Sequence, residues 1–128
     1  MYAPTNPTQR VNYLNELFTH INNVQNHEYT IIAGDFNITL EEIDIQGERG
    51  NQRIGRAELK NIVDAFTLND AFRQKNPGVI DSTFINKTHC RSARLDRVYF
   101  SNNIPICKAF HIASTLDFTD HKAVLIKQ

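Results

Sequence analysis

The first third of the chain repeats apolar residues at the spacing of an amphipathic helix. The repeating positions are Val11, Leu14, Leu17, Phe18, Ile21 and Val24. This spacing predicts a helix over residues 7–26. Asn6 is a suitable N-cap, and Pro7 fits the first helical position because its φ angle is already fixed near the helical value.

A second stretch with the same period follows later in the chain. Its apolar positions are Leu59, Ile62, Val63, Phe66 and Leu68. They predict a helix over residues 56–72, which the turn sequence Asn76-Pro77-Gly78 would end.

The rest of the pattern is typical of short strands. A β-branched apolar run predicts a strand over residues 29–33, ending at Gly34-Asp35-Phe36-Asn37. Further strands are expected at 82–85, 94–100, 109–114 and 123–126. Helices early and strands late indicate a layered α/β fold with a mixed sheet, and not a doubly wound parallel sheet.

Composition narrows the class of protein without deciding its function. The chain has 128 residues, which fits one domain, 1–128. No apolar run reaches the length of a membrane span, so no membrane partner is expected. The absence of a signal-like start and the two cysteines predict an intracellular protein of the nucleus or cytoplasm. Fourteen basic residues balance fourteen acidic ones, which argues against purely electrostatic binding of nucleic acid but not against an enzyme with a local basic patch.

The strongest chemical candidate is the Gly34-Asp35-Phe36-Asn37 sequence. Asp35 and Asn37 lie two residues apart after a strand, so both side chains are expected on one face. Their acceptor and donor groups could hold a water molecule against a phosphate. The alternative is an ordinary Asp-Asn turn that caps the strand end.

Two further sites carry carboxylates beside basic groups. Asp120-His121 suits a divalent metal with proton transfer, or phosphate binding, although a surface Asp-His pair is usually without function. Asp96 lies in the Arg94-Leu95-Asp96-Arg97 segment, where a carboxylate on an apolar strand needs a partner. A solvated edge strand is the alternative interpretation.

A basic loop is the last candidate. Arg49, Arg53, Arg56 and Lys60 are spaced by three or four residues, but Gly50 and Gly55 argue against a helix over most of this stretch. We interpret it as a mobile loop that could contact a phosphate backbone, with a plain solvated loop as the alternative.

Taken in order, five segments are far more specific than any one of them. They are Tyr2-Ala3-Pro4, Gly34-Asp35-Phe36-Asn37, Ser82-Thr83-Phe84, Ser92-Ala93-Arg94-Leu95-Asp96-Arg97-Val98-Tyr99-Phe100-Ser101 and Thr119-Asp120-His121. This series resembles the endonuclease/exonuclease/phosphatase superfamily. Within it, the chain is most similar to the apurinic-type endonuclease domains of non-LTR retrotransposons and to the exonuclease III class of repair nucleases.

The resemblance implies a role for each matched residue. Tyr2 would bond the scissile phosphate, Asp35 would orient or deprotonate the attacking water, and Asn37 would help to hold that water. His121 would contact the phosphate and be held in place by Asp96. The implied metal is Mg²⁺, with Mn²⁺ as an alternative, bound by Asp120 and Asp35. DNA is the implied substrate. The expected contacts with it come from Arg49, Arg53 and Arg56 of the basic loop, and from Arg94.

The resemblance also implies an incomplete site. The family fold is a four-layer sandwich of two similar halves, and this sequence matches only the second half: one mixed or antiparallel sheet with helices on one face. The family's N-terminal Asn strand and metal-ligating Glu have no counterpart here. Three hypotheses follow: half of a Mg²⁺-dependent DNA endonuclease, an inactive remnant that binds nucleic acid or protein, and a phosphatase for a small substrate.

A half-fold also predicts a partner for its uncovered sheet. Without the other half, one apolar sheet face would be open to water, and monomers seldom expose large apolar patches. The candidate residues on that face are Ile31, Leu95 or Val98, and Val124 or Ile126. We expect this face to be covered by the missing half or by self-association, for which one self-complementary patch is sufficient.

Overall fold

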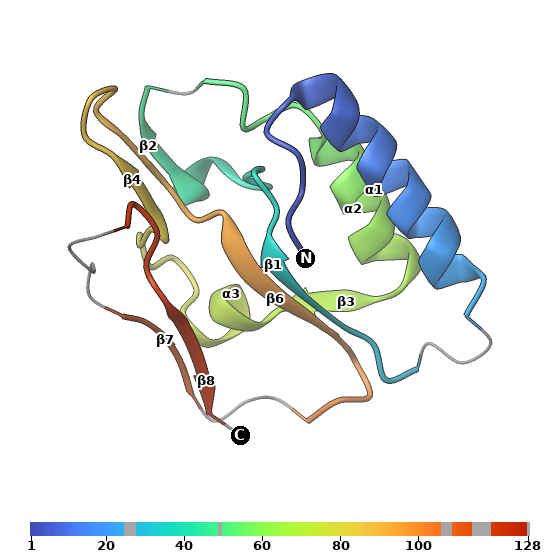
Figure 1. The fold of residues 1–128 in the computed structure, drawn as a ribbon. Helices are drawn as coiled ribbons and strands as arrows, with labels where there is room; N and C mark the ends of the chain where they lie inside the picture. The colour runs from blue at the N-terminus through green and yellow to red at the C-terminus, as the bar shows by residue number, and fades with distance from the viewer. Residues whose placement is uncertain (25–27, 49, 106–108, 114–118, 128) are drawn as a thin grey trace.

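The computed structural model describes residues 1–24, 28–48, 50–105, 109–113 and 119–127. Within these ranges the helices and strands follow the order drawn in Figure 1. They are α1 (Pro7–Asn22), β1 (Ile31–Asp35), the 3-10 helix η1 (Glu42–Asp44), β2 (Ile45–Gly47), α2 (Arg56–Ala65), β3 (Leu68–Asp70), α3 (Ala71–Lys75), β4 (Phe84–Asn86), β5 (Arg91–Ala93), β6 (Asp96–Ser101), β7 (Ala109–Ile112) and β8 (Val124–Lys127).

Helix α1 begins where the sequence predicts and ends earlier. The Asn6 side chain accepts a hydrogen bond from the Gln9 N–H at 3.0 Å, which confirms the N-cap. The expected helix over 7–26 stops at Asn22, because the Val24 N–H donates to the Ile21 carbonyl three residues back and tightens the last turn. Residues 25–27 lie outside the described residues.

The single helix expected over 56–72 is wrong. Helix α2 ends at Ala65, and Thr67 adopts a left-handed φ of 51°. The chain then pairs as β3 with β6, and the Asp70 side chain caps the short helix α3. The apolar period continues through this junction because Leu68 faces the same core as α2.

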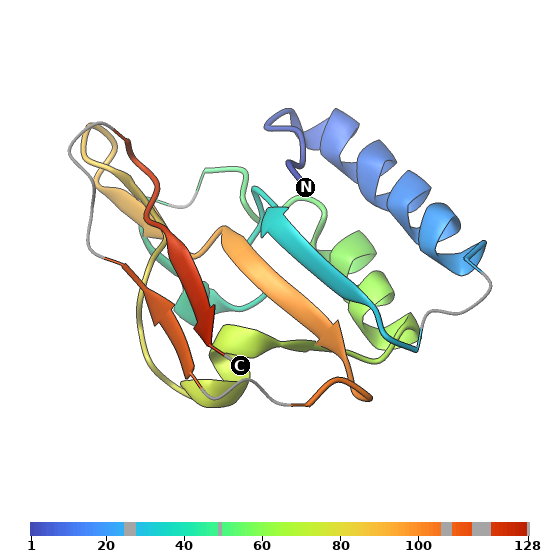
Figure 2. The same ribbon diagram turned by 60° about the horizontal axis from the view of Figure 1, so that its bottom comes forward.

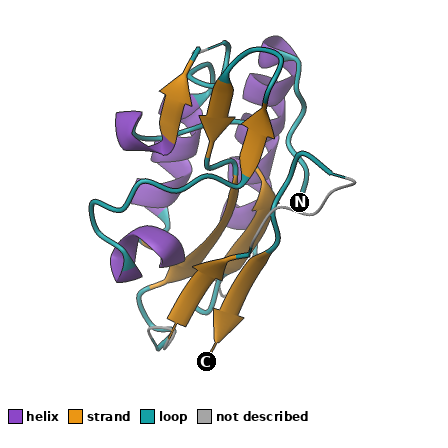
Figure 3. Ribbon diagram, turned by 90° about the vertical axis from the view of Figure 1, so that its left-hand side faces the viewer, coloured by secondary structure: helices purple, strands orange, loops and turns teal. Residues whose placement is uncertain are grey.

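Within the described residues, the strands form three hydrogen-bonded sets, and every pairing between named strands is antiparallel. Their orders are β1-β6-β3, β2-β5-β4 and β7-β8, as far as the described residues show. The α/β class with antiparallel sheet is thus confirmed, although the strands of the described segments do not form one continuous ladder. Figure 3 shows the set β2-β5-β4 apart from the other strands.

Several strand limits differ from the expected ones. The first strand begins and ends two residues later than the sequence suggested, so Asp35 is its last residue. The strand expected at 94–100 begins at Asp96, because residues 94 and 95 form a break between β5 and β6. Of the strand expected at 109–114, Ser114 lies outside the described residues.

The sheet β1-β6-β3 lies between two layers, as Figure 2 shows. On one face α1 and α2 pack through Leu14 and Leu59 against Tyr99 of β6. On the other face α3 and the β7–β8 hairpin pack through Phe72 and Phe110 against Phe100. Adjacent residues of β6 therefore belong to opposite cores, as the alternation of a strand requires.

The apolar face expected to be bare is partly covered. Ile31 is 61% exposed and Ile126 is 38% exposed, as expected, but Val98 and Val124 pack against the core that contains Phe72. Leu95 is a correction: it is buried beside β2 and β5, because it lies in the strand break. Among the described residues, no helix is long and apolar enough to cross a membrane.

Candidate active site

Three side chains from distant parts of the sequence meet at the ends of β1 and β6. Asp35 ends β1, Asp96 begins β6, and the two residues are direct partners in the antiparallel register. His121 reaches them from the segment before β8, where it forms an antiparallel bridge with Phe84. The sheet register therefore places both carboxylates beside one imidazole.

The contacts within this cluster are short. His121 Nδ1 lies 2.8 Å from Asp96 Oδ2, and His121 Nε2 lies 3.8 Å from Asp35 Oδ2. One potential ligand atom from each residue falls within 4.8 Å of the others. Because an ionised carboxylate can only accept a hydrogen bond, the short contact assigns the Nδ1–H to the side facing Asp96.

Asp35 is the most buried member of the cluster, with 9% of its surface exposed. Burial raises the pKa of Asp35 above its usual value, and the neighbouring Asp96 charge raises it further. The Asn37 N–H, which donates to Asp35 Oδ1 at 2.8 Å, opposes this shift, as do the charges of His121 and Arg10. A carboxylate with a raised pKa is a better proton acceptor than a fully solvated one.

Asn37 and Tyr2 lie beside Asp35 on its other side. Asn37 has a left-handed φ of 52°, and its side-chain amide donates to the Ala3 carbonyl at 2.6 Å. Tyr2 forms a parallel backbone bridge with Asp35 while its side chain is 66% exposed. The structure thus brings the N-terminal segment to the site, and the roles expected for Tyr2 and Asn37 stay predictions.

Asp120 is not part of the cluster that the described residues form. It is exposed, and its backbone carbonyl accepts a hydrogen bond from the Ile85 N–H at 3.0 Å. Asp96 takes part in the cluster instead. The expected metal ligation by Asp120 stays a prediction, while Asp35 is a member of the cluster.

The expected nucleic-acid contacts separate into different cases. Arg53 and Arg56 both bond the Glu42 carboxylate, at 2.6 and 2.9 Å, so the loop is less basic than its sequence suggests. Arg49 lies outside the described residues. Arg94 is a correction: it is 1% exposed and bonded to Asp44 and Asp70, so it stabilises the fold and does not face DNA.

Sequence reasoning did not foresee the structural role of two buried arginines near the site. Arg97 donates to the carbonyls of Ile38 and Arg94 at 2.7 and 3.1 Å, which ties the loop after β1 to the loop before β6. Arg10 donates to the carbonyls of Pro4 and Asn51, at 3.0 and 2.9 Å. Arg10 could have been noticed in the sequence, because it lies four residues before Leu14 on the apolar face of α1.

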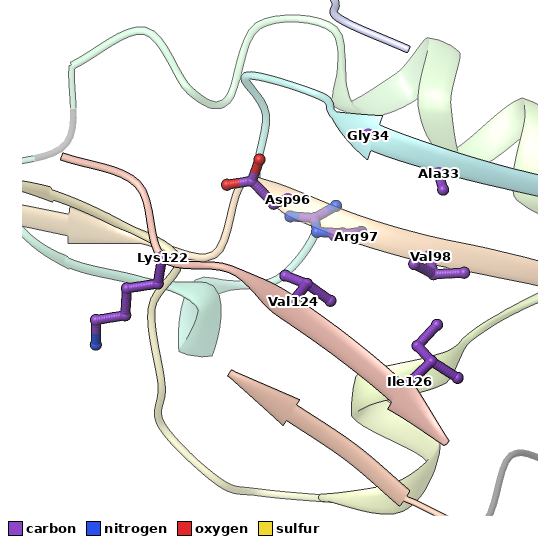
Figure 4. Close-up of a pocket in the computed structure, with 8 residues that line it drawn as sticks. All are labelled: Ala33, Gly34, Asp96, Arg97, Val98, Lys122, Val124 and Ile126. Atoms are coloured by element: carbon purple, nitrogen blue, oxygen red, sulfur yellow. The ribbon is translucent and has the colours of Figure 1, made fainter. Parts of the chain in front are cut away.

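A groove of about 390 Å³ extends from this cluster between the sheet and β8. Figure 4 shows Asp96 at one end of it and Ile126 towards the other, with Ala33, Val98 and Val124 between them. The groove is polar beside the cluster and apolar along β8.

The donor set fits a hard divalent cation. Two carboxylates and one imidazole converge. The carboxylates carry like charges and lie close together, because Asp35 and Asp96 are paired residues in the register of β1 and β6. Mg²⁺ typically binds one or two carboxylates and keeps several waters, and Mn²⁺ accepts the same oxygen ligands.

Residues 2–121 match the model of the Endonuclease/Exonuclease/phosphatase family. The chain belongs to this family. The family and the fold expected from the five sequence segments are thereby confirmed.

Two individual proteins are similar to the chain. It is 26% identical over 129 aligned positions to the "Transposon TX1 uncharacterized 149 kDa protein" of Xenopus laevis, covering 99% of this chain and 10% of that protein. It is similar in fold to an AP endonuclease from Archaeoglobus fulgidus, with a TM-score of 0.79 and 16% identity. That match covers 92% of this chain and 52% of the AP endonuclease, so the chain spans about half of that fold.

Proposed function

We propose that this chain carries the histidine-bearing half of a Mg²⁺-dependent DNA endonuclease site. The observation that supports this most directly is the cluster of Asp35, Asp96 and His121, in a chain that matches the family model over residues 2–121. The matched transposon protein and AP endonuclease support a DNA substrate over a small phosphorylated molecule. A DNA substrate is also consistent with a nuclear or cytoplasmic setting.

The reaction we infer is hydrolysis of a phosphodiester bond. Asp35, with its raised pKa, takes a proton from the attacking water as the water oxygen bonds to phosphorus. The bond from phosphorus to the leaving sugar oxygen then breaks, and that oxygen takes a proton from solvent.

His121 and Asp96 act together on the phosphate. Asp96 accepts the Nδ1–H of His121, which fixes the ring and turns Nε2 towards Asp35, the side where the water would react. A bound Mg²⁺ or Mn²⁺ would be held by Asp35 and Asp96, and it would stabilise negative charge on the phosphate oxygens. Tyr2 and Asn37, beside Asp35, would bond the phosphate and the water.

The test is a plasmid-nicking assay with Mg²⁺, with Mn²⁺ and with a chelator. We expect His121→Ala to lower nicking by roughly 100-fold or more, because general acid–base and charge effects of one group are typically that large. His89→Ala is the matched control, since His89 is an exposed histidine paired with Glu48 on the β4–β5 turn. Equal loss in both variants, or nicking that persists in chelator, would contradict the proposal.

The half-length match makes the second assay arm essential. Because the chain spans 52% of the AP endonuclease fold, it should be measured alone and with a separately expressed N-terminal half from a related full domain. Activity that appears only with that half supports a divided site. If neither arm nicks DNA while the chain still binds it, the alternative is favoured: a non-catalytic module that binds nucleic acid or protein, for which the apolar groove beside β8 offers a surface.

A further inference from the structure

Thr83 is fully buried between the two segments that carry Asp96 and His121. Its backbone N–H donates to the Ala93 carbonyl at 3.0 Å, at the end of β5. Its carbonyl accepts from the Lys122 N–H at 2.7 Å, directly after His121. The main chain of Thr83 therefore joins the two sides of the site.

The Thr83 hydroxyl completes a break in the sheet. Strand β5 ends at Ala93 and β6 begins at Asp96, so the N–H groups at this junction cannot all follow the strand ladder. Thr83 Oγ1 accepts from both the Leu95 N–H and the Asp96 N–H, each at 3.0 Å. A buried backbone N–H without an acceptor is strongly disfavoured, so the hydroxyl determines how the chain enters β6.

The residue after Thr83 contacts the other member of the pair. Phe84 forms the antiparallel bridge with His121, and the two ring centroids lie 5.2 Å apart. One short segment, Thr83-Phe84, thus holds the backbone of Asp96 through a side chain and the backbone of His121 through a strand bridge.

We propose that Thr83 is a positioning residue whose hydroxyl, by accepting the Leu95 and Asp96 N–H groups, sets the orientation at which Asp96 holds His121. This inference rests on the proposed function for the meaning of the Asp96–His121 pair. Thr83 does not touch the reacting atoms. Its effect passes through the 2.8 Å contact between Asp96 Oδ2 and His121 Nδ1.

The test uses two substitutions that separate the hydroxyl from the packing. Thr83→Val keeps the shape and removes the acceptor, whereas Thr83→Ser keeps the hydroxyl and removes a methyl group. The main readout is the imidazole tautomer of His121, measured by nitrogen-15 NMR at about pH 8.5, where a free imidazole is neutral. We expect the unchanged chain and Thr83→Ser to keep the proton on Nδ1, and Thr83→Val to lose this preference.

A matched control removes a similar hydroxyl at the other end of β6. Ser101 is 4% exposed, and its Oγ accepts from the Thr30 N–H at 3.1 Å. Ser101→Ala should lower the melting temperature and leave the His121 tautomer unchanged. A merely structural role for Thr83 predicts the same behaviour for Thr83→Val, so the tautomer distinguishes the two explanations.

Where nicking is measurable, Thr83→Val should lower it roughly 10- to 100-fold, the usual cost of losing a partner that orients a site residue. The proposal is overturned if Thr83→Val keeps the Nδ1–H tautomer, or if Thr83→Ser loses it as completely as Thr83→Val. The tautomer needs no DNA cleavage, so a chain that fails to nick leaves this test intact.

Amide hydrogen exchange keeps the proposal testable if Thr83→Val does not fold. In the unchanged chain, the Leu95 and Asp96 N–H groups should exchange as slowly as those inside β6. Fast exchange at both positions would show that the hydroxyl does not hold them, and would overturn the inference.

Discussion

The environment of Asp35 favours the neutral, protonated form of its carboxyl group. Burial and the nearby Asp96 charge raise the pKa of Asp35, and the Asn37 N–H offsets only part of this effect. Such a group suits proton transfer, because it binds a proton more readily than a solvated carboxylate does. The same environment makes its ionised form unfavourable for the folded state.

This conflict predicts that Asp35→Asn stabilises the protein at neutral pH. Between the unfolded pKa of about 3.9 and the raised folded pKa, the folded state binds more protons than the unfolded state, so stability falls as pH rises. Asparagine removes that cost and keeps an oxygen that can accept from the Asn37 N–H. We expect a higher melting temperature than the unchanged chain at about pH 7, and a smaller difference at about pH 4.

The control is an exposed carboxylate. Asp64 pairs with Lys60 one helical turn away, with 60% of its side chain exposed, so Asp64→Asn should change the melting temperature little at either pH. An Asp35→Asn protein that melts below the unchanged chain at neutral pH would show that Asp35 is stabilised as an anion, against this account.

A buried arginine network fixes the break between β5 and β6. Asp44 is 1% exposed and accepts from Arg94 and Arg73, at 2.9 and 2.6 Å. Burial alone would raise the pKa of Asp44, but its bonds to Arg94 and the nearby charge of Arg97 outweigh this, and the pKa lies below the usual value. The contribution of the network to stability is therefore fully present above the usual pKa of an aspartate, and it is lost as the pH falls through the lowered pKa of Asp44.

Patterns along the sequence predict elements better than junctions. The Asn6-Pro7 start of α1 follows from local capping chemistry alone, and it is confirmed. The junction at Thr67 depends on pairing between Leu68 and Ser101, 33 residues later, which no local pattern contains. The strand β3 was missed for that reason.

For the site too, the residues could be predicted from the sequence, whereas contacts that depend on the fold could not. The order of the five segments identified Asp35, Asp96 and His121, and the structure brings them together. The fate of Arg94 could not be read from its neighbours, because its partners Asp44 and Asp70 lie 50 and 24 residues away. Thr83 was visible in the sequence as part of a matched segment, but its hydroxyl's partners depend on the fold.

The junction after α2 provides a test at the level of the element. Thr67 is a β-branched residue at φ 51°, a conformation that costs an ordinary residue roughly 1–2 kcal/mol. We expect Thr67→Gly to raise the free energy of unfolding by about 1 kcal/mol, because glycine adopts the left-handed conformation without that cost. Urea unfolding measures the change.

The matched substitution lies inside a helix. Thr19 is in α1, so Thr19→Gly should lower the free energy of unfolding by roughly 0.3 kcal/mol, the opposite sign. A destabilising Thr67→Gly would indicate that the threonine side chain, and not its backbone angle, matters at this junction.

At the scale of the whole molecule, the uncovered part of the sheet lies beside β8. Ile126 lines the groove, and Ile31 lies exposed at the other end of β1, on the strand that forms the groove's far wall through Ala33. Strand β8 pairs with β7, and within the described residues no named strand pairs with its other edge. An edge of this kind is a template for a further strand.

We therefore expect the chain to self-associate through this face when no other half is present. Burying apolar surface contributes roughly 25 cal/mol per Å², and a two-fold dimer buries the same apolar patch on both copies of the chain. Sedimentation velocity over a range of micromolar concentrations should show a concentration-dependent dimer.

The discriminating pair of variants lies on β8 itself. Ile126→Asp places a charge in the groove and should abolish the dimer, whereas Leu125→Asp places the same charge on the opposite side of the strand, where Leu125 is 55% exposed, and should leave the dimer intact. If both variants dimerise like the unchanged chain, the contact lies elsewhere, and a chain that stays monomeric throughout would show that this face needs no cover.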